Sequence, residues 1–309
     1  MTTVARPTAD RGGIDIVDRR SGRRVTEVVL GDRWMRLAYA APLRPLTRMT
    51  LFRWAFCSRL MGWYADRPRS RRGIRRTIAA LGIDTAEFRD PVESFSTFNE
   101  FFYRHLRPEA RPFDPSPDAL LSPADCRLLV MPELTGETCV PVKGRAFTVP
   151  ALLGPGHTDL AERFRGGALA VCRLCPADYH RYHYPAGGTE TQHWAVPGRF
   201  DSVNPMALAL GLEVFTHNRR QISLLDLDVF GTCAFVEVGA FGVAGIVQTH
   251  ARGPFARMAE KGYFTFGGST LVLVFTPGSV AFADDLVDNS RAGLETLVRC
   301  GETIGRRPA

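Results

Sequence analysis

Two histidines and an aspartate lie close together in one short segment of the chain. Residues 175–185 read CPADYHRYHYP and place Asp178, His180 and His183 between two prolines. Histidine is the side chain that changes its charge most readily near neutral pH, so it often transfers protons in enzymes. Two histidines three residues apart in a tyrosine-rich turn therefore indicate either acid–base chemistry or a partly buried, hydrogen-bonded pair.

Two other segments contain the remaining parts of a nucleophile-activating relay. Asp125 follows a proline in the segment LSPADCR, a position where aspartate usually forms a turn. Ser269 follows two glycines in YFTFGGSTLVLVF, residues 263–275. A serine, a histidine and an aspartate that meet in space can turn the serine hydroxyl into a nucleophile. Composition alone does not bring these three residues together.

A zinc site is the alternative use of the histidine pair. Cys172 and Cys175 form a Cys-x-x-Cys pair just before His180 and His183. The gap between the two pairs is much shorter than in zinc fingers, and residues three apart in a strand point to opposite faces. We therefore expect no metal. The seven cysteines are odd in number and scattered, which argues against a disulfide framework and favours a reducing compartment.

The second two thirds of the chain predict the β-rich structure that must position these residues. From about residue 120 onward, short runs rich in β-branched and aromatic residues are separated by Gly, Pro or Asn. These runs are RLLVM, GALAVCRL, TETQHWAV, QISLLDLDVF, TCAFVEVGA, VAGIVQTH, YFTF, TLVLVF and SVAFA. The pattern predicts a mainly antiparallel β sandwich or barrel, with helical insertions near 147–165 and 285–299. The uncharged run 262–283 contains a glycine pair and a proline, so it predicts strand–turn–strand rather than a membrane span.

The first third of the chain predicts helices instead. Helices are expected over 33–41, 46–65 and 71–82, and the last of these ends at Gly82. A further short helix begins at a capping box formed by Thr97 and Glu100. The second helix combines aromatic residues with arginines, which is typical of a helix that lies in a lipid headgroup layer. A helical subdomain that packs on the core is the alternative.

The positive charge of the chain is concentrated in this first third. Residues 1–109 contain 21 Arg, no Lys and 12 acidic residues, so they carry +9, whereas the rest of the chain carries −2. Such an excess favours a polyanion, either nucleic acid or an anionic membrane surface. Zinc-finger and RNA-binding signatures are absent from the sequence, so we expect no nucleic-acid partner. The polar residues 1–24 have no signal-peptide pattern and are expected to be disordered.

The region from about 95 to 283 resembles the phosphatidylserine decarboxylase family. Seven strings occur in the order and at the spacing of that family: FNEFFYRHLRP, SPADCR, VKGRAFTVPALLG, CPADYHRYHYPAGG, VPGRFDSVNP, NRRQISLLD and FGGST. The last motif usually reads Leu-Gly-Ser-Thr, and Gly267 replaces that leucine, a variant the family also uses. Cys126 replaces a glycine that usually follows the aspartate. Neither change removes a reacting group, although Cys126 adds a side chain near the expected site.

The resemblance implies a proenzyme that cuts itself between Gly268 and Ser269. By analogy, Asp125 orients His183, and His183 takes the proton from the Ser269 hydroxyl, which attacks the carbonyl of Gly268. The ester that results breaks by elimination, and loss of ammonia leaves a pyruvoyl group in place of Ser269. The products would be a β chain, residues 1–268, and an α chain, residues 269–309. Thr270 is a further candidate, as a hydrogen-bond donor to the ester.

The resemblance also implies the reaction and the cofactor. The pyruvoyl group would be the covalent cofactor, because its ketone condenses with the amino group of the serine headgroup and acts as an electron sink while CO2 leaves. His180 would then protonate the resulting carbanion. The substrate would be phosphatidylserine and the product phosphatidylethanolamine.

The predicted organisation is an α+β fold in three regions. These are a disordered segment (1–24), a helical, basic, membrane-associating region (25–109) and a β-rich catalytic domain (110–309). The expected partners are a phospholipid substrate, an anionic membrane surface and the two chains of one precursor, with a homodimer left open. The expected location is the cytoplasmic face of the cell membrane, as a peripheral protein. Two alternatives stay open: a pyruvoyl decarboxylase of another serine-headgroup lipid or an amino acid, and a non-catalytic membrane-binding β-domain.

Overall fold

The computed structural model describes residues 14–27, 55–134, 147–198, 214–239, 245–267 and 269–308. The helix expected over 33–41 and the first part of the helix expected over 46–65 lie outside these residues, as does Gly268 of the expected cleavage site.

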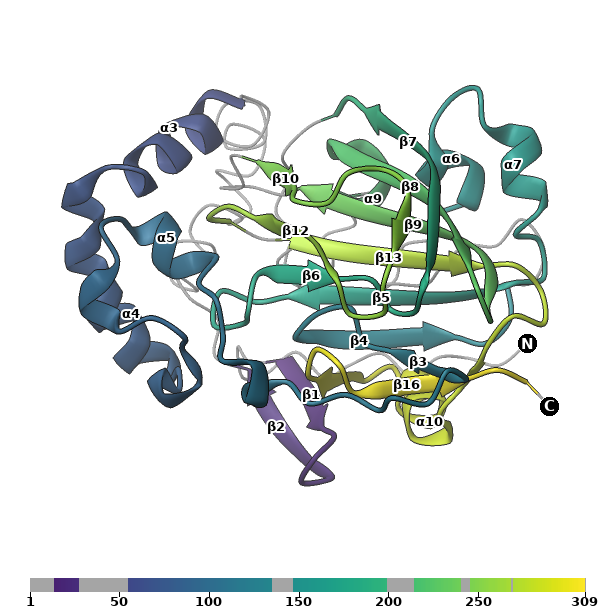
Figure 1. The fold of residues 1–309 in the computed structure, drawn as a ribbon, viewed down its shortest axis with the longest axis horizontal. Coiled ribbons are helices and arrows are strands. Elements are labelled where there is room, and N and C mark those ends of the chain that lie inside the picture. Colours follow the sequence, from purple (N-terminus) through teal and green to yellow (C-terminus); the bar gives the residue numbers. More distant parts are fainter. Residues whose placement is uncertain are drawn as a thin grey trace, which may run out of the picture.

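Ten strands of the described chain form one sheet at the centre of the structure (Figure 1). Neighbouring strands are antiparallel except β1 and β15, which are parallel. From one edge to the other the strands are β11 (Pro254–Phe255), β7 (Gly188–Val196), β8 (Arg220–Leu227), β9 (Gly231–Gly239), β13 (Ser269–Phe275), β5 (Ala168–Leu174), β4 (Cys126–Met131), β15 (Glu295–Val298), β1 (Ile14–Asp18) and β2 (Arg23–Glu27). The expected α+β fold with a mainly antiparallel β core is confirmed.

Two small sheets and several short helices complete the described structure. One small sheet contains β10 (Ile246–Gln248), β12 (Glu260–Phe264) and β6 (Arg181–His183), and the other contains β14 (Ala281–Phe282), β16 (Thr303–Arg306) and β3 (Ala119–Leu121). The α-helices are α3 (Ala55–Ala65), α4 (Ile74–Leu81), α5 (Phe98–Phe102), α6 (Val149–Leu153), α7 (Thr158–Glu162), α9 (Val214–His217) and α10 (Asp284–Arg291). The 3-10 helices are η1 (Pro68–Gly73), η2 (Thr85–Glu87), η3 (Val92–Ser94) and η4 (Pro108–Ala110).

The side chains of β13 alternate between two hydrophobic clusters, one on each face of the large sheet. Leu271, Leu273 and Phe275 pack with residues of the two small sheets and α10, and we call this side the small-sheet face. Val272 and Val274 pack with residues of α6, α7 and α9, and we call this side the helix face. All seven residues of β13 are buried, which explains why the strand is a continuous apolar run in the sequence.

The N-terminal helices form a separate group beside the sheet (Figure 1). Their hydrophobic cluster contains Ile74, Phe88, Phe95 and Phe101. Helix α4 ends as expected, because Gly82 follows it in the left-handed conformation with φ 62°. The cap of α5 is also confirmed, since the Thr97 hydroxyl accepts a hydrogen bond from the Glu100 N–H at 3.2 Å. Within the described part of the chain, none of the helices has the length and apolar character needed to cross a membrane.

Two expectations about local structure are wrong. Residues 1–24 are expected to be disordered, but within the described part of this segment β1 and β2 form a hairpin over 14–27 that extends the large sheet through β15, while residues 1–13 lie outside the described residues. The residues of β2 are mostly exposed and polar, so this strand has no buried apolar stripe that the sequence could reveal. The helix expected near 285–299 ends early, because α10 stops at Arg291 and Gly293 turns the chain with φ 75° into β15.

Gly262 in β12 occupies a position where a larger residue does not fit. A Cβ atom added there would lie 2.5 Å from the Tyr182 hydroxyl oxygen and would also overlap the Val247 carbonyl oxygen. We expect Gly262→Ala to lower the free energy of unfolding by about 2–3 kcal/mol through overpacking. Gly73→Ala is the matched control, because its nearest side-chain atom would lie 3.7 Å away, at ordinary contact distance. Urea titration of both variants measures the difference, and equal stabilities would show that β12 can shift to accommodate the added methyl group.

Candidate active site

The register of β13 fixes the position of Ser269, the first residue of that strand. Ser269 pairs with Leu174 on β5 and with Gly239 on β9. Side chains alternate along a strand, so Ser269 lies on the small-sheet face with Leu271. Its side chain is fully buried, and its Oγ has no hydrogen-bond partner among the described residues. An unpartnered buried hydroxyl is costly, so it marks a candidate reactive group.

The segment that contains the histidines begins where the strand beside Ser269 ends. Leu174 is the last residue of β5, and the chain then runs through 175–180 into β6. The His180 carbonyl accepts a hydrogen bond from the Phe264 N–H at 3.0 Å, and β6 pairs with β12. The connection from β12 to β13 therefore runs from the neighbourhood of His180 to Ser269. The fold thus brings the serine and the histidine segment to the same end of the large sheet.

The His180 imidazole is held as a neutral base. Its Nδ1 lies 3.0 Å from the Asp178 carbonyl oxygen, and a carbonyl accepts only, so Nδ1 carries the proton. Its Nε2 is buried without a partner among the described residues. The ring packs on Phe102 with a centroid distance of 3.7 Å. Burial lowers the pKa of His180 to about 3, a shift that the Asp178 carbonyl opposes.

The His183 imidazole is also neutral, and both of its nitrogens have hydrogen-bond partners. Its Nδ1 donates to the Met258 carbonyl oxygen at 3.0 Å, and its Nε2 lies 3.3 Å from the Tyr179 hydroxyl. Met258 has φ 57°, a left-handed backbone conformation that a side chain disfavours. Burial lowers the pKa of His183. The His183 N–H donates to the Pro123 carbonyl at 2.9 Å, which joins β6 to the segment of Asp125.

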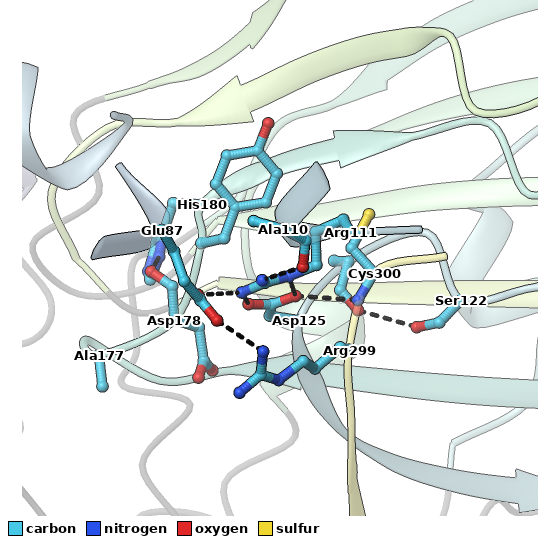
Figure 2. Close-up of polar contacts among 12 residues, drawn as sticks. Glu87, Ala110, Arg111, Ser122, Asp125, Ala177, Asp178, His180, Arg299 and Cys300 are labelled. Carbon is cyan, nitrogen blue, oxygen red and sulfur yellow. Dashed lines mark hydrogen bonds and ion pairs between the residues drawn. The ribbon is translucent and has the colours of Figure 1, made fainter. Parts of the chain in front are cut away.

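Asp125 is buried beside β4 and is bound by an arginine (Figure 2). Arg111 donates from Nε to Oδ1 at 2.8 Å and from Nη2 to Oδ2 at 2.5 Å, and the Cys300 N–H donates to Oδ1 at 2.9 Å. Burial alone would raise the pKa of Asp125, but the hydrogen bonds and charge of Arg111 bring that pKa below its ordinary value. The carboxylate is therefore ionised at neutral pH.

The four expected residues gather at one end of the sheet without forming a continuous relay. Strand β5 separates β4 from β13, so the backbones of Asp125 and Ser269 lie about 10 Å apart. Within the described ranges, no hydrogen bond joins Asp125 to His183, and none joins Ser269 Oγ to either histidine. Thr270 lies on the helix face, opposite to Ser269, and its hydroxyl is also unpartnered there.

Two groups of buried charges near the site escaped the sequence analysis. On the helix face, Arg173 binds Glu27 at 3.0 Å and Glu295 at 2.5 Å, while Arg127 binds Asp178. On the small-sheet face, the fully buried Lys261 binds Glu237 at 2.8 Å. The available signal was a single charge inside an apolar strand, as in GALAVCRL and TCAFVEVGA.

Of the two cysteines that suggested zinc, only Cys175 belongs to the first of these groups, whereas Cys172 packs in the hydrophobic cluster on the small-sheet face. Cys175 Sγ lies 3.0 Å from Arg173 Nη1 and 2.6 Å from Glu27 Oε1. Burial raises the pKa of the Cys175 thiol, so it stays protonated. In the residues that the structure describes, no group of three or more His, Cys, Asp or Glu is placed to hold a metal ion.

Comparisons with known proteins identify the family. The sequence profile of the family described as phosphatidylserine decarboxylase matches residues 98–306. A phosphatidylserine decarboxylase proenzyme of Desulfitobacterium hafniense strain Y51 is 36% identical over 295 residues, covering 95% of this chain and 98% of the relative. Proteins of the same name from Ruminiclostridium cellulolyticum and Chlamydia caviae are 38% and 37% identical, covering 94% and 95% of this chain and 97% and 98% of their own. The chain belongs to the phosphatidylserine decarboxylase family.

The low pKa of His180 makes a prediction about stability. An unfolded histidine takes up a proton near pH 6.5, whereas the folded His180 takes one up only near pH 3. The free energy of unfolding therefore decreases as the pH falls below 6.5, because only the unfolded state gains the proton. In a Ser269→Ala background, which removes the candidate nucleophile, we expect unfolding free energy to fall between pH 6 and pH 4. This decrease should be steeper, by about 1 kcal/mol per pH unit, than in the same Ser269→Ala protein that also carries His180→Gln. Urea titrations across this range measure both slopes, and equal slopes would contradict the buried neutral imidazole.

Proposed function

We propose that this chain is a phosphatidylserine decarboxylase proenzyme that cuts itself between Gly268 and Ser269. The mature enzyme then converts phosphatidylserine into phosphatidylethanolamine and CO2. The observation that carries this proposal is the buried, unpartnered Ser269 hydroxyl at the start of β13, on the small-sheet face and at the end of the sheet where β5 leads into the histidine segment. The family of the chain agrees with this reading.

The surroundings of Ser269 fit a pyruvoyl group formed from it. The residue is held by β5 on one side and β9 on the other, so its position does not depend on the peptide bond before it. Its direct partner on β9 is Gly239, which has no side chain and leaves room beside Ser269. Once formed, the pyruvoyl group supplies the electron sink for loss of CO2 from the serine headgroup.

His183 is the proposed base for self-cleavage. Its Nδ1–H is donated to the Met258 carbonyl, which leaves the Nε2 lone pair to receive a proton from Ser269. The Tyr179 hydroxyl occupies that position at 3.3 Å, a long distance for such a hydrogen bond, so it is readily exchanged. The ionised Asp125 stabilises the imidazolium that forms. The Ser269 oxygen attacks the Gly268 carbonyl and the chain becomes an ester, which elimination and hydrolysis then split with release of ammonia.

His180 is the proposed carrier of the proton in decarboxylation. Its Nε2 is unprotonated in the proenzyme, so it must gain a proton before it can donate one. The ammonium group of the serine headgroup brings such a proton to the site. His180 Nε2 takes up that proton and returns it to the α-carbon after CO2 has left.

The region 25–109 is the proposed membrane-associating part, at the cytoplasmic face of the cell membrane. Helix α3 exposes Leu60, Met61, Trp63 and Tyr64 to solvent. Arg67 stacks on the Trp63 ring at 4.3 Å, and the arginines of η1 beside it are exposed. Apolar and aromatic side chains next to arginines suit insertion between the headgroups of anionic lipids.

The nucleophile is tested by replacing Ser269. Wild-type protein should give two chains, with the smaller one starting at residue 269 and blocked to Edman sequencing because a pyruvoyl group has no amine. Ser269→Ala should remain whole and release no CO2 from phosphatidylserine. His183→Ala should remain whole as well, whereas His180→Ala should be cut and decarboxylate poorly. Intact mass and CO2 release measure both steps; a Ser269→Ala chain that is still cut after Gly268 contradicts the proposal.

The membrane contact is tested with the exposed aromatic residues of α3. We expect Trp63→Ala/Tyr64→Ala to bind phosphatidylserine-containing vesicles at least about tenfold more weakly, because each aromatic ring loses its apolar burial. Phe113→Ala is the matched control, since Phe113 is also exposed but lies outside the helical group. Added salt should weaken binding of the wild type. Vesicle sedimentation gives the affinities, and equal binding of all three proteins would show that α3 does not contact the membrane.

A further inference from the structure

The carboxylate of Asp125 is bound by a guanidinium group to which the proposed mechanism gives no role. Arg111 follows η4 and approaches Asp125 with two parallel N–H groups, at 2.8 Å and 2.5 Å (Figure 2). Such a fork fixes the plane of the carboxylate as well as its distance. The side chains are only 11% and 10% exposed, so water competes little for these hydrogen bonds.

Arg111 is itself held in place by groups from other parts of the chain. Its Nη2 also donates to Glu87 Oε2 at 2.9 Å, and its Nη1 donates to the Ala110 carbonyl at 2.7 Å. Glu87 Oε1 accepts from Arg299 Nη1 at 2.6 Å (Figure 2). Asp125 thus accepts hydrogen bonds from the residue after η4 and from Cys300 beyond β15, while Glu87 of η2 binds both Arg111 and Arg299.

The hydrogen bonds of Asp125 leave a defined opening. An ionised carboxylate has about four acceptor positions, two on each oxygen. Arg111 and the Cys300 N–H fill both positions on Oδ1, and Arg111 fills one on Oδ2. One position on Oδ2 stays open. His183 is anchored close by, through its N–H to the carbonyl of Pro123, two residues before Asp125.

We propose that Arg111 is a positioning residue for self-cleavage, which keeps Asp125 ionised and holds its carboxylate in one orientation beside the segment that anchors His183. This inference rests on the role proposed above for Asp125. Arg111 touches neither Ser269 nor the substrate in this account. It acts only through the charge and orientation of the carboxylate.

The electrostatics of the site give the proposal a distinctive signature. Burial raises the pKa of Asp125, and Arg111, the Cys300 N–H and Arg299 together more than offset this effect, with Arg111 the largest of the three. Without Arg111, burial would dominate and the pKa would rise. Self-cleavage that needs the ionised carboxylate is present above this pKa and lost below it, so its acidic limb would move to higher pH. The other titratable or charged groups around Asp125 are Glu87, Arg104, Asp178, Tyr179, His180, His183 and the Cys300 thiol.

The test is the pH dependence of self-cleavage in freshly synthesised full-length chains. We expect Arg111→Met to be cut roughly tenfold more slowly than wild type at pH 7, with its acidic limb at least about one pH unit higher and with recovery at alkaline pH. Arg306→Met is the matched control, because Arg306 pairs with Asp114 and Asp118 at the surface and not with Asp125. The rate at which the small chain forms is followed by gel electrophoresis at each pH.

Three outcomes would overturn the inference about Arg111. These are a wild-type pH profile for Arg111→Met, an equal slowing at every pH, and an equal shift in Arg306→Met. If Arg111→Met does not fold, Arg111→Lys is the deciding variant, because lysine keeps the positive charge but lacks the two parallel N–H groups. Its self-cleavage should show the acidic limb of the wild type and a lower maximal rate. A wild-type plateau in Arg111→Lys, or a shifted limb, would contradict the proposal. Failure of the proposed function is seen separately, as cutting of Ser269→Ala.

Discussion

The two backbone ladders of β13 constrain the candidate site more strongly than any side-chain contact. Every residue of this strand pairs with β5 on one side and with β9 on the other. The position of Ser269 is therefore set by the middle of the sheet and not by the turn that precedes it. Cleavage before Ser269, as proposed, would also leave the sheet intact, because β13 lies between β5 and β9 while β15 lies between β4 and β1. Both chains would share one hydrophobic core, with no linker needed between them.

Buried charges then fix the segment that contains the histidines. Arg127 and the Cys175 N–H bind the Asp178 carboxylate, and the Asp178 carbonyl in turn binds His180 Nδ1. Buried ion pairs contribute little net stability because desolvation offsets their attraction, but an unpaired member is costly. We infer that they disfavour other conformations of the segment, because those would leave Asp178 or Arg127 buried without its partner. The tautomer of His180 therefore depends on an arginine that lies two strands away from Ser269.

The sequence predicted the interior of the sheet better than its edges. Strands β4, β5, β8, β9 and β13 are apolar runs bounded by Gly, Pro or Asn, so composition and turn residues suffice to find them. In the N-terminal hairpin, strand β2 is mostly exposed and polar, yet it supplies Glu27, which binds Arg173 at 3.0 Å. The structural role of the hairpin comes from the pairing of β1 with β15, residues 295–298, at the other end of the chain. No local pattern could reveal that contact.

The candidate site could be predicted as a set of residues that lie near one another, but its network of contacts could not. Motifs identified Asp125, His180, His183 and Ser269, and the strand register explains why they share one end of the sheet. The binding of Asp125 by Arg111 could not be predicted, because the geometry of the chain between them decides which of many arginines reaches the carboxylate.

The neutrality of both imidazoles imposes an order on the proposed chemistry. A neutral buried histidine can accept a proton once the Tyr179 hydroxyl moves away from its Nε2, which suits His183 in the proposed self-cleavage. The same burial prevents His180 from donating a proton until it has received one. In the proposed mechanism, the proenzyme can therefore activate Ser269 before any substrate is present, whereas proton return to the product waits for the ammonium group of the lipid. One apolar environment thus serves a base first and an acid later, and the arrival of substrate separates the two steps.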